Sequence, residues 1–146
     1  MTPFSSSIRS HFKGVVDSTL REGFQFAGAN FSPDDQAEIF DRLVRLGVES
    51  VEGGTPVQPE IRERISALRE RRGEIRSPRL FAHIRNHERD IQAAAACRVD
   101  GVSILCTADA ERLAAMGLSR DSARLRLRDN IALASSLGLE DRKSVV

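Results

Sequence analysis

Short apolar runs alternate with longer amphipathic segments along this chain, and this alternation limits its fold more than any other feature. We predict strands at 15–19, 48–52, 80–84 and 101–106, and we expect a fifth strand to begin within 142–146. The apolar runs do not alternate strictly with polar residues. Strands of this kind are buried on both faces, as in a parallel sheet that is covered by helices.

Helices are predicted between these strands. Ser32 has the character of an N-cap, Pro33 suits the first helical position, and Gly47 is a natural stop at the other end. The other predicted helices are 59–71, 90–97 and 119–137. The chain therefore repeats a strand–helix unit four times.

Two α/β architectures fit this repeat: a doubly wound open sheet and part of a (β/α)8, or TIM, barrel. The turn Gly23–Gly28 lacks the G-x-G-x-x-G spacing of a nucleotide-binding open sheet, which favours the barrel. A complete barrel needs about 250 residues. The 146 residues thus predict an N-terminal tail at 1–12 and about half of a TIM barrel at 13–146.

Half a barrel leaves open sheet edges, and we expect it to have an apolar inner face as well. Such surfaces promote association. Two alternatives follow. The chain pairs with a second copy or with another half-barrel chain to complete the barrel, or it is a fragment of a longer chain with the remainder in missing sequence.

The net charge, the cysteines and the lengths of the apolar runs indicate which binding partners and which cellular location to expect. With 22 basic and 21 acidic residues the net charge is +1, which predicts neither nucleic acid nor membrane as a partner. Cys97 and Cys106 lack metal-binding spacing and are expected to be reduced thiols. No apolar run approaches the ~18 residues of a membrane span. Residues 1–12 also lack a secretory apolar region, so we expect a cytoplasmic protein.

Polar residues follow four consecutive predicted strands. In a parallel barrel, chemistry is carried by the carboxyl ends of the strands. Four such ends together indicate a site for a metal or an anion. The residues are Asp17, Arg21 and Glu22 after the first strand, Glu52 at the second, His83, Arg85 and His87 at the third, and Thr107 and Asp109 at the fourth.

Structural interpretations stand beside the functional ones. Glu22 has the alternative of a loop ion pair with Arg21. Glu52 is costly to bury alone, so it faces a polar cavity or pairs with an arginine. A metal site made by His83 and His87 is disfavoured because these residues straddle a strand end. Cys106 is expected to be an apolar filler, and Thr107 and Asp109 have the alternative of being turn residues.

Three motifs extend the argument to a family. They are Asp17-Ser18-Thr19-Leu20-Arg21-Glu22-Gly23-x-Gln25-Phe26, His83-Ile84-Arg85-x-His87 and Val99-Asp100-Gly101-Val102. In these motifs the chain resembles the N-terminal half of the metal-dependent acyl-CoA condensing enzymes. That family includes homocitrate synthase and 2-isopropylmalate synthase, with hydroxymethylglutaryl-CoA lyase as a relative. The signature is most similar to the homocitrate synthase form.

The resemblance implies a role for each matching residue. Glu22 is the implied ligand of a divalent metal cation (Mg, Mn or Zn), and Arg21 is the implied catalytic contact to the oxyanion. Glu52 is implied near the reacting centre as a second catalytic residue. The implied substrate contacts, besides Arg21, are Gln25, His83, Arg142 and Ser144.

The implied activity is an acyltransferase of amino-acid biosynthesis that condenses acetyl-CoA with a 2-oxo acid, 2-oxoglutarate being favoured. Two features depart from the family: Phe24 replaces a polar residue, and the chain has no His-x-His pair. Two further hypotheses therefore remain, a non-catalytic remnant or interaction module and an acyl-CoA lyase. The motif at 83–87 favours condensation over cleavage.

Overall fold

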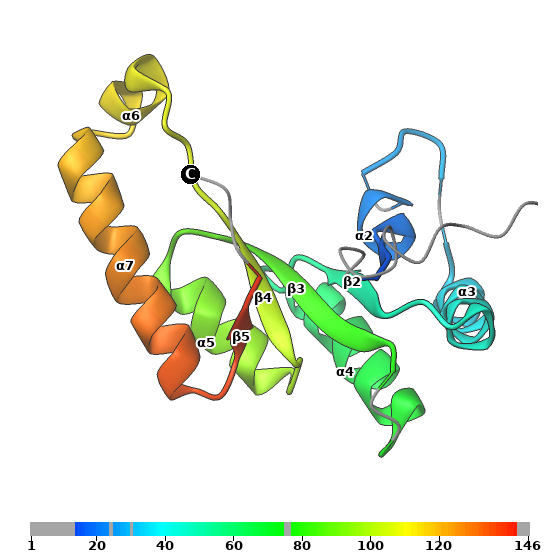
Figure 1. Ribbon diagram of the computed structural model, residues 1–146. Coiled ribbons are helices and arrows are strands. Elements are labelled where there is room, and N and C mark those ends of the chain that lie inside the picture. Colours follow the sequence, from blue (N-terminus) through cyan, green and yellow to red (C-terminus); the bar gives the residue numbers. More distant parts are fainter. Residues whose placement is uncertain (1–13, 24, 30, 75–76, 143–146) are drawn as a thin grey trace, which may run out of the picture.

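A computed structural model describes residues 14–23, 25–29, 31–74 and 77–142, so the tail predicted at 1–12 lies outside the described residues. Five parallel strands form one sheet, and neighbours in the chain are neighbours in the sheet (Figure 1). The strands are β1 (Val16–Asp17), β2 (Ser50–Gly54), β3 (Arg79–Arg85), β4 (Gly101–Leu105) and β5 (Glu140–Asp141).

The strand order decides between the two predicted architectures. A doubly wound sheet reverses its order at a switch point, whereas a barrel adds each strand beside the previous one. The order here is β1-β2-β3-β4-β5 without reversal. Because parallel crossovers are right-handed, an unreversed order places the connecting helices on one side of the sheet. The prediction of about half a TIM barrel is confirmed.

Six helices are described: α2 (Thr19–Gly23), α3 (Pro33–Leu46), α4 (Pro59–Arg72), α5 (Glu88–Ala96), α6 (Ala110–Ala115) and α7 (Arg120–Ser136). The four long helices match the predicted ones to within two residues at each end. In α3, Ser32 forms a capping box with Asp35, and Gly47 ends the helix with a φ of 72°. None of the described helices is both long enough and apolar enough for a membrane crossing.

Two short helices and the last strand differ from the sequence-based expectation. Thr19 was expected in the first strand but begins α2, and α6 begins after its N-cap Asp109. The fifth strand pairs Glu140 and Asp141 with β4, so it starts before the expected Arg142. Charged residues are rare in strands, but an edge strand such as β5 tolerates them.

Alternate residues of β3 show which face of the sheet is which. Leu80, Ala82 and Ile84 are fully buried and belong to the core under the helices. The intervening residues of the strand therefore face the inner, concave side. At the inner positions of β2, β3 and β4, only Phe81 and Leu105 are large and apolar. The expectation of an apolar inner face is therefore wrong.

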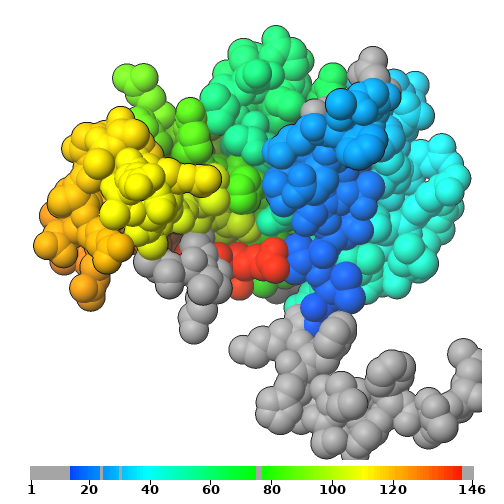
Figure 2. All heavy atoms as spheres, turned by 90° about the horizontal axis from the view of Figure 1, so that it is seen from above, coloured from blue at the N-terminus to red at the C-terminus, as the bar shows by residue number. Residues whose placement is uncertain are grey.

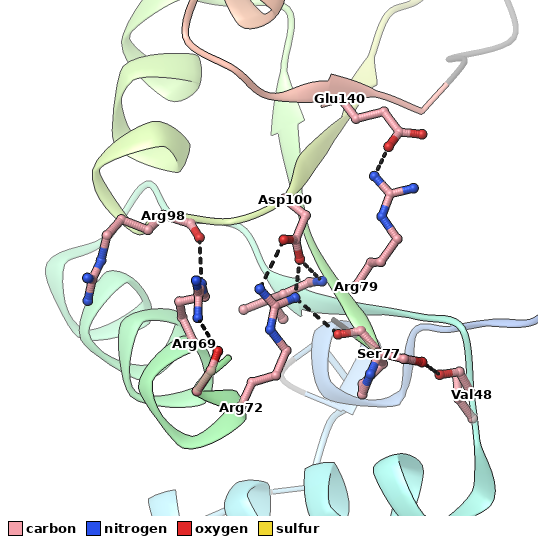
Figure 3. Close-up of polar contacts among 11 residues, drawn as sticks. Val48, Arg69, Arg72, Ser77, Arg79, Arg98, Asp100 and Glu140 are labelled. Carbon is pink, nitrogen blue, oxygen red and sulfur yellow. Dashed lines mark hydrogen bonds and ion pairs between the residues drawn. The ribbon is translucent and has the colours of Figure 1, made fainter. Parts of the chain in front are cut away.

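A polar network joins three elements at the amino end of the strands (Figure 3). The guanidinium of Arg72, at the end of α4, forms an ion pair with Asp100, just before β4. The carboxylate of Asp100 also accepts the backbone N–H of Leu80 on β3 at 2.6 Å. Burial raises the pKa of Asp100, but the hydrogen bonds from Arg72 and Leu80 lower it by more. In barrels this end of the sheet carries stability rather than chemistry.

Candidate functional site

Arg21 is placed by the short helix α2, at the carboxyl end of β1. The helix begins where Asp17 accepts hydrogen bonds from the backbone N–H and the hydroxyl of Thr19. The Nε atom of Arg21 donates to Glu52 Oε2 at 2.7 Å, and its Nη2 lies 2.5 Å from Glu22 Oε1. Its side chain is only 17% exposed. A guanidinium is thus held between two carboxylates.

Glu52, on β2, is the most enclosed charge of the site, with a side chain 6% exposed. Besides Arg21, it accepts a hydrogen bond from the Ser103 hydroxyl of β4 at 3.2 Å. The Nη1 atom of Arg142 lies 3.5 Å from it. Burial alone would raise the pKa of Glu52. The positive charge of Arg21 and hydrogen bonds from Arg21, Ser18 and Ser103 outweigh this effect, so the pKa is lowered. The carboxylate is therefore ionised at neutral pH, and of the two alternatives given above the pairing with an arginine is found.

His83 lies on β3 beside Glu52, facing the same concave side. Burial lowers the pKa of His83, and the nearby positive charge of Arg21 lowers it further. The charges of Glu52 and Glu22 oppose this shift without reversing it. His83 is consequently neutral at about pH 7, with one ring nitrogen able to donate and the other able to accept a hydrogen bond.

We call these residues the strand-end cluster. Every strand of the sheet contributes to it, either directly or through the residues that follow. Figure 2 shows the molecule from above, the side on which the carboxyl ends of the strands lie. The blue residues after β1 are on one side and the yellow residues after β4 are on the other. The members of the strand-end cluster are Arg21, Glu22, Glu52, His83, Ser103 and Arg142.

Glu22 tests how well the described residues fit a metal. Its side chain is 57% exposed and forms an ion pair with Arg21, the structural alternative given above, although the pair lies in α2 and not in a loop. Within the described ranges, no three His, Cys, Asp or Glu side chains are grouped to hold a metal ion. Structural and catalytic zinc sites normally use three or more protein ligands, whereas Mg²⁺ is usually held by one or two carboxylates together with the substrate. The described residues therefore supply one candidate ligand, fewer than a zinc centre uses.

Other predicted site residues lie apart from the cluster. Gln25 is exposed after α2, and its backbone N–H donates to Glu22 O. His87 is the N-cap of α5, where its ring accepts from the backbone N–H of Arg89. This hydrogen bond engages His87 at the start of the helix. Ser144 lies outside the described residues.

The remaining candidates have structural roles. The guanidinium of Arg85 is paired with the buried carboxylate of Asp90 at 2.8 and 2.9 Å. The Thr107 hydroxyl accepts from Asp109 N, and Asp109 caps α6, so both are turn residues. Cys106 packs against the core, as a filler does.

Ser103 and Ser18 contact Glu52 and were missed by sequence reasoning. A serine within an apolar strand gives no indication in the sequence that it contacts a functional side chain. The available signal was its register: Ser103 lies opposite His83 in the parallel ladder, so both side chains face the same side.

A family model described as HMGL-like matches residues 14–145. Homocitrate synthase from Sulfolobus acidocaldarius is 36% identical over 137 residues, which cover 90% of this chain and 29% of that protein. Homocitrate synthase from Saccharolobus islandicus is 35% identical over 132 residues, or 88% of this chain and 29% of that protein. The chain thus spans less than a third of the length of these relatives.

A solved structure has a similar fold. The HMG-CoA lyase from Brucella melitensis superposes with a TM-score of 0.70 at 20% sequence identity, over 88% of this chain and 46% of that chain. At this identity the likeness concerns the fold alone.

Proposed function

The chain belongs to the HMGL-like family, and we propose that its strand-end cluster is the 2-oxo acid site of an acyltransferase. The proposed reaction condenses acetyl-CoA with a 2-oxo acid, with 2-oxoglutarate as the favoured substrate. The observation that carries the proposal is the Arg21 guanidinium held between Glu22 and Glu52 at the carboxyl end of the sheet. The similarity to homocitrate synthases supports the choice of reaction.

Arg21 is the proposed contact to the reacting end of the 2-oxo acid. Its Nε and Nη2 atoms are engaged by the two carboxylates. Its Nη1 atom has no partner in the part of the chain that the structure describes, which leaves two N–H donors. A guanidinium offers planar, permanently charged donors to a carboxylate or to a developing oxyanion.

Glu52 has a different proposed task. A carboxylate with a lowered pKa is a weak base. We therefore assign Glu52 to holding Arg21 beside the reacting centre rather than to accepting a proton. For the second carboxylate of a dicarboxylic substrate, we propose the neutral ring of His83 and the charge of Arg142 as contacts.

The charges of the strand-end cluster bear on the proposed metal. Arg21 and Arg142 balance Glu22 and Glu52, so the cluster is neutral overall. A divalent cation at Glu22 would offset the two negative charges of a bound 2-oxo dicarboxylate. Because the described residues do not complete a metal centre, we assign no step of the chemistry to a metal.

Titration calorimetry with 2-oxoglutarate tests the proposed site. We expect binding to the unaltered chain and a loss of at least about tenfold in affinity for Arg21→Ala, the equivalent of one charge-assisted contact. Arg45→Ala, an exposed arginine of α3, is the matched control and is expected to bind normally. Equal affinity in the two variants contradicts the site. Thiol release from acetyl-CoA in the presence of 2-oxoglutarate then tests the condensation itself.

A second candidate is binding without turnover. The observation that favours it is the lack of a three-ligand metal group among the described residues. Under this candidate, 2-oxoglutarate binds in an Arg21-dependent way, but no thiol is released with any added divalent metal. Thiol release above the background rate contradicts it.

A further inference from the structure

A cleft of about 710 Å³ opens beside the sheet, between the ends of β3 and β4 and the helices α6 and α7. We call it the α6 cleft. Its volume is in the range of small-molecule sites. None of its lining residues belongs to the strand-end cluster. They include apolar side chains and four arginines.

The α6 cleft presents apolar side chains to solvent. Leu105, which ends β4, is 59% exposed, and Met116, which follows α6, is 62% exposed. The buried side chain of Leu113 lies between them in the chain and also lines the cleft. Covering exposed apolar area in a concave site with an apolar ligand is favourable. These side chains are suited to an aliphatic group.

The α6 cleft is also positively charged. It is lined by four arginines and by one acid, Asp90. Both oxygens of Asp90 are already engaged by Arg85. Arg89, Arg112 and Arg126 form no ion pair with a described acidic residue. Cations that lack counter-charges around an apolar surface attract an anion that carries an apolar body.

We propose that the α6 cleft binds a small amphipathic anion. Its head, a carboxylate or a phosphate, would be held by Arg112 and Arg126. Its aliphatic tail would cover Leu105 and Met116. This site is separate from the 2-oxo acid site proposed above, and either proposal stands without the other.

Titration calorimetry of the full chain with octanoate and with octyl phosphate tests this proposal. We expect at least one of them to bind with a one-to-one ratio. Octylammonium, which reverses the charge, and inorganic phosphate, which lacks the tail, are expected to bind at least about tenfold more weakly. Tighter binding of octanoate identifies a carboxylate head, and tighter binding of octyl phosphate identifies a phosphate head.

Two variants on one helix supply the matched control. Arg126→Ala is expected to weaken binding of the preferred anion about fivefold, as loss of one charge contact does. Arg124→Ala removes an exposed arginine outside the cleft and is expected to bind as the unaltered chain does. The proposal is overturned if neither anion binds, if octylammonium binds as tightly as octanoate, or if the two variants bind alike. Far-UV circular dichroism checks that both variants are folded.

Discussion

The Nη1 atom of Arg142 lies 3.5 Å from Oε1 of Glu52, so the residue after the fifth strand reaches the carboxylate of the second. Glu52 also holds Arg21, which comes from the first strand end. The concave curve of the sheet brings these distant ends together. The two arginines differ in environment, because Arg142 is 45% exposed and Arg21 only 17%.

Arg142→Ala is expected to lower the affinity for 2-oxoglutarate about tenfold, since it removes one of two cations near the proposed substrate. The free energy of unfolding should change by less than about 1 kcal/mol, because a half-exposed ion pair contributes little. Calorimetry and urea denaturation measure the two quantities. Arg128→Ala, in an exposed pair with Asp129, is the control. An unchanged affinity in Arg142→Ala would remove Arg142 from the site.

Arg72→Ala is expected to destabilise the fold by about 3–5 kcal/mol, because it leaves the carboxylate of Asp100 without its partner in a largely enclosed network. The neighbouring Arg71 pairs with Asp41 at 2.6 Å, but both side chains are partly exposed. Arg71→Ala should therefore cost less than about 1 kcal/mol. Urea unfolding followed by circular dichroism compares the two. Similar losses of unfolding free energy in the two variants would show that burial of the ion pair does not determine its contribution to stability.

Asp90→Asn tests the acid sensitivity of the Arg85 pair. The hydrogen bond from Arg85 lowers the pKa of Asp90 in the folded chain. A lowered pKa contributes stability that is present above the unfolded value of about 3.9 and is lost as the pH falls through the folded value. The unaltered chain should therefore lose its advantage over Asp90→Asn as the pH decreases from about 5 towards 2. Denaturation curves across this range measure the difference, and parallel profiles would contradict the assignment.

Asp141→Asn should change the stability in the opposite direction to Asp90→Asn at neutral pH. Burial raises the pKa of Asp141, and its Oδ1 atom is enclosed without a hydrogen-bond partner among the described residues. A raised carboxyl pKa costs stability as the pH rises from the unfolded value of about 3.9 through the folded value. Asp141→Asn should thus be more stable than the unaltered chain at neutral pH and equal to it near pH 2. Thermal unfolding at both pH values tests this, and a less stable variant at neutral pH would refute it.

Elements with a clear period were predictable from the sequence, and short or charged ones were not. Helix α3, which Ser32 caps, has a proline at its first position and an apolar stripe, and it was predicted within a residue at each end. Helices α2 and α6 have five and six residues, which is too few for a helical period to appear. Strand β5 was not predicted at Glu140 and Asp141 because charged residues are atypical of strands.

The site was predictable where topology alone decides position. Arg21 follows β1, and Glu52 and His83 lie on the neighbouring parallel strands β2 and β3, so their proximity follows from the fold. The pairing of Arg85 with Asp90 depends on a rotamer choice that a sequence pattern does not carry. The participation of Ser103 depends on strand register, which is set by packing across the whole sheet.

The position of Arg21 between two carboxylates has a consequence for the entropy of ligand binding. A mobile arginine gives up about 2 kcal/mol of rotamer entropy when it is ordered. Here Glu22 and Glu52 order the side chain during folding, before any ligand arrives. An incoming anion therefore meets a guanidinium that has already lost its freedom, and its affinity is not reduced by ordering that side chain.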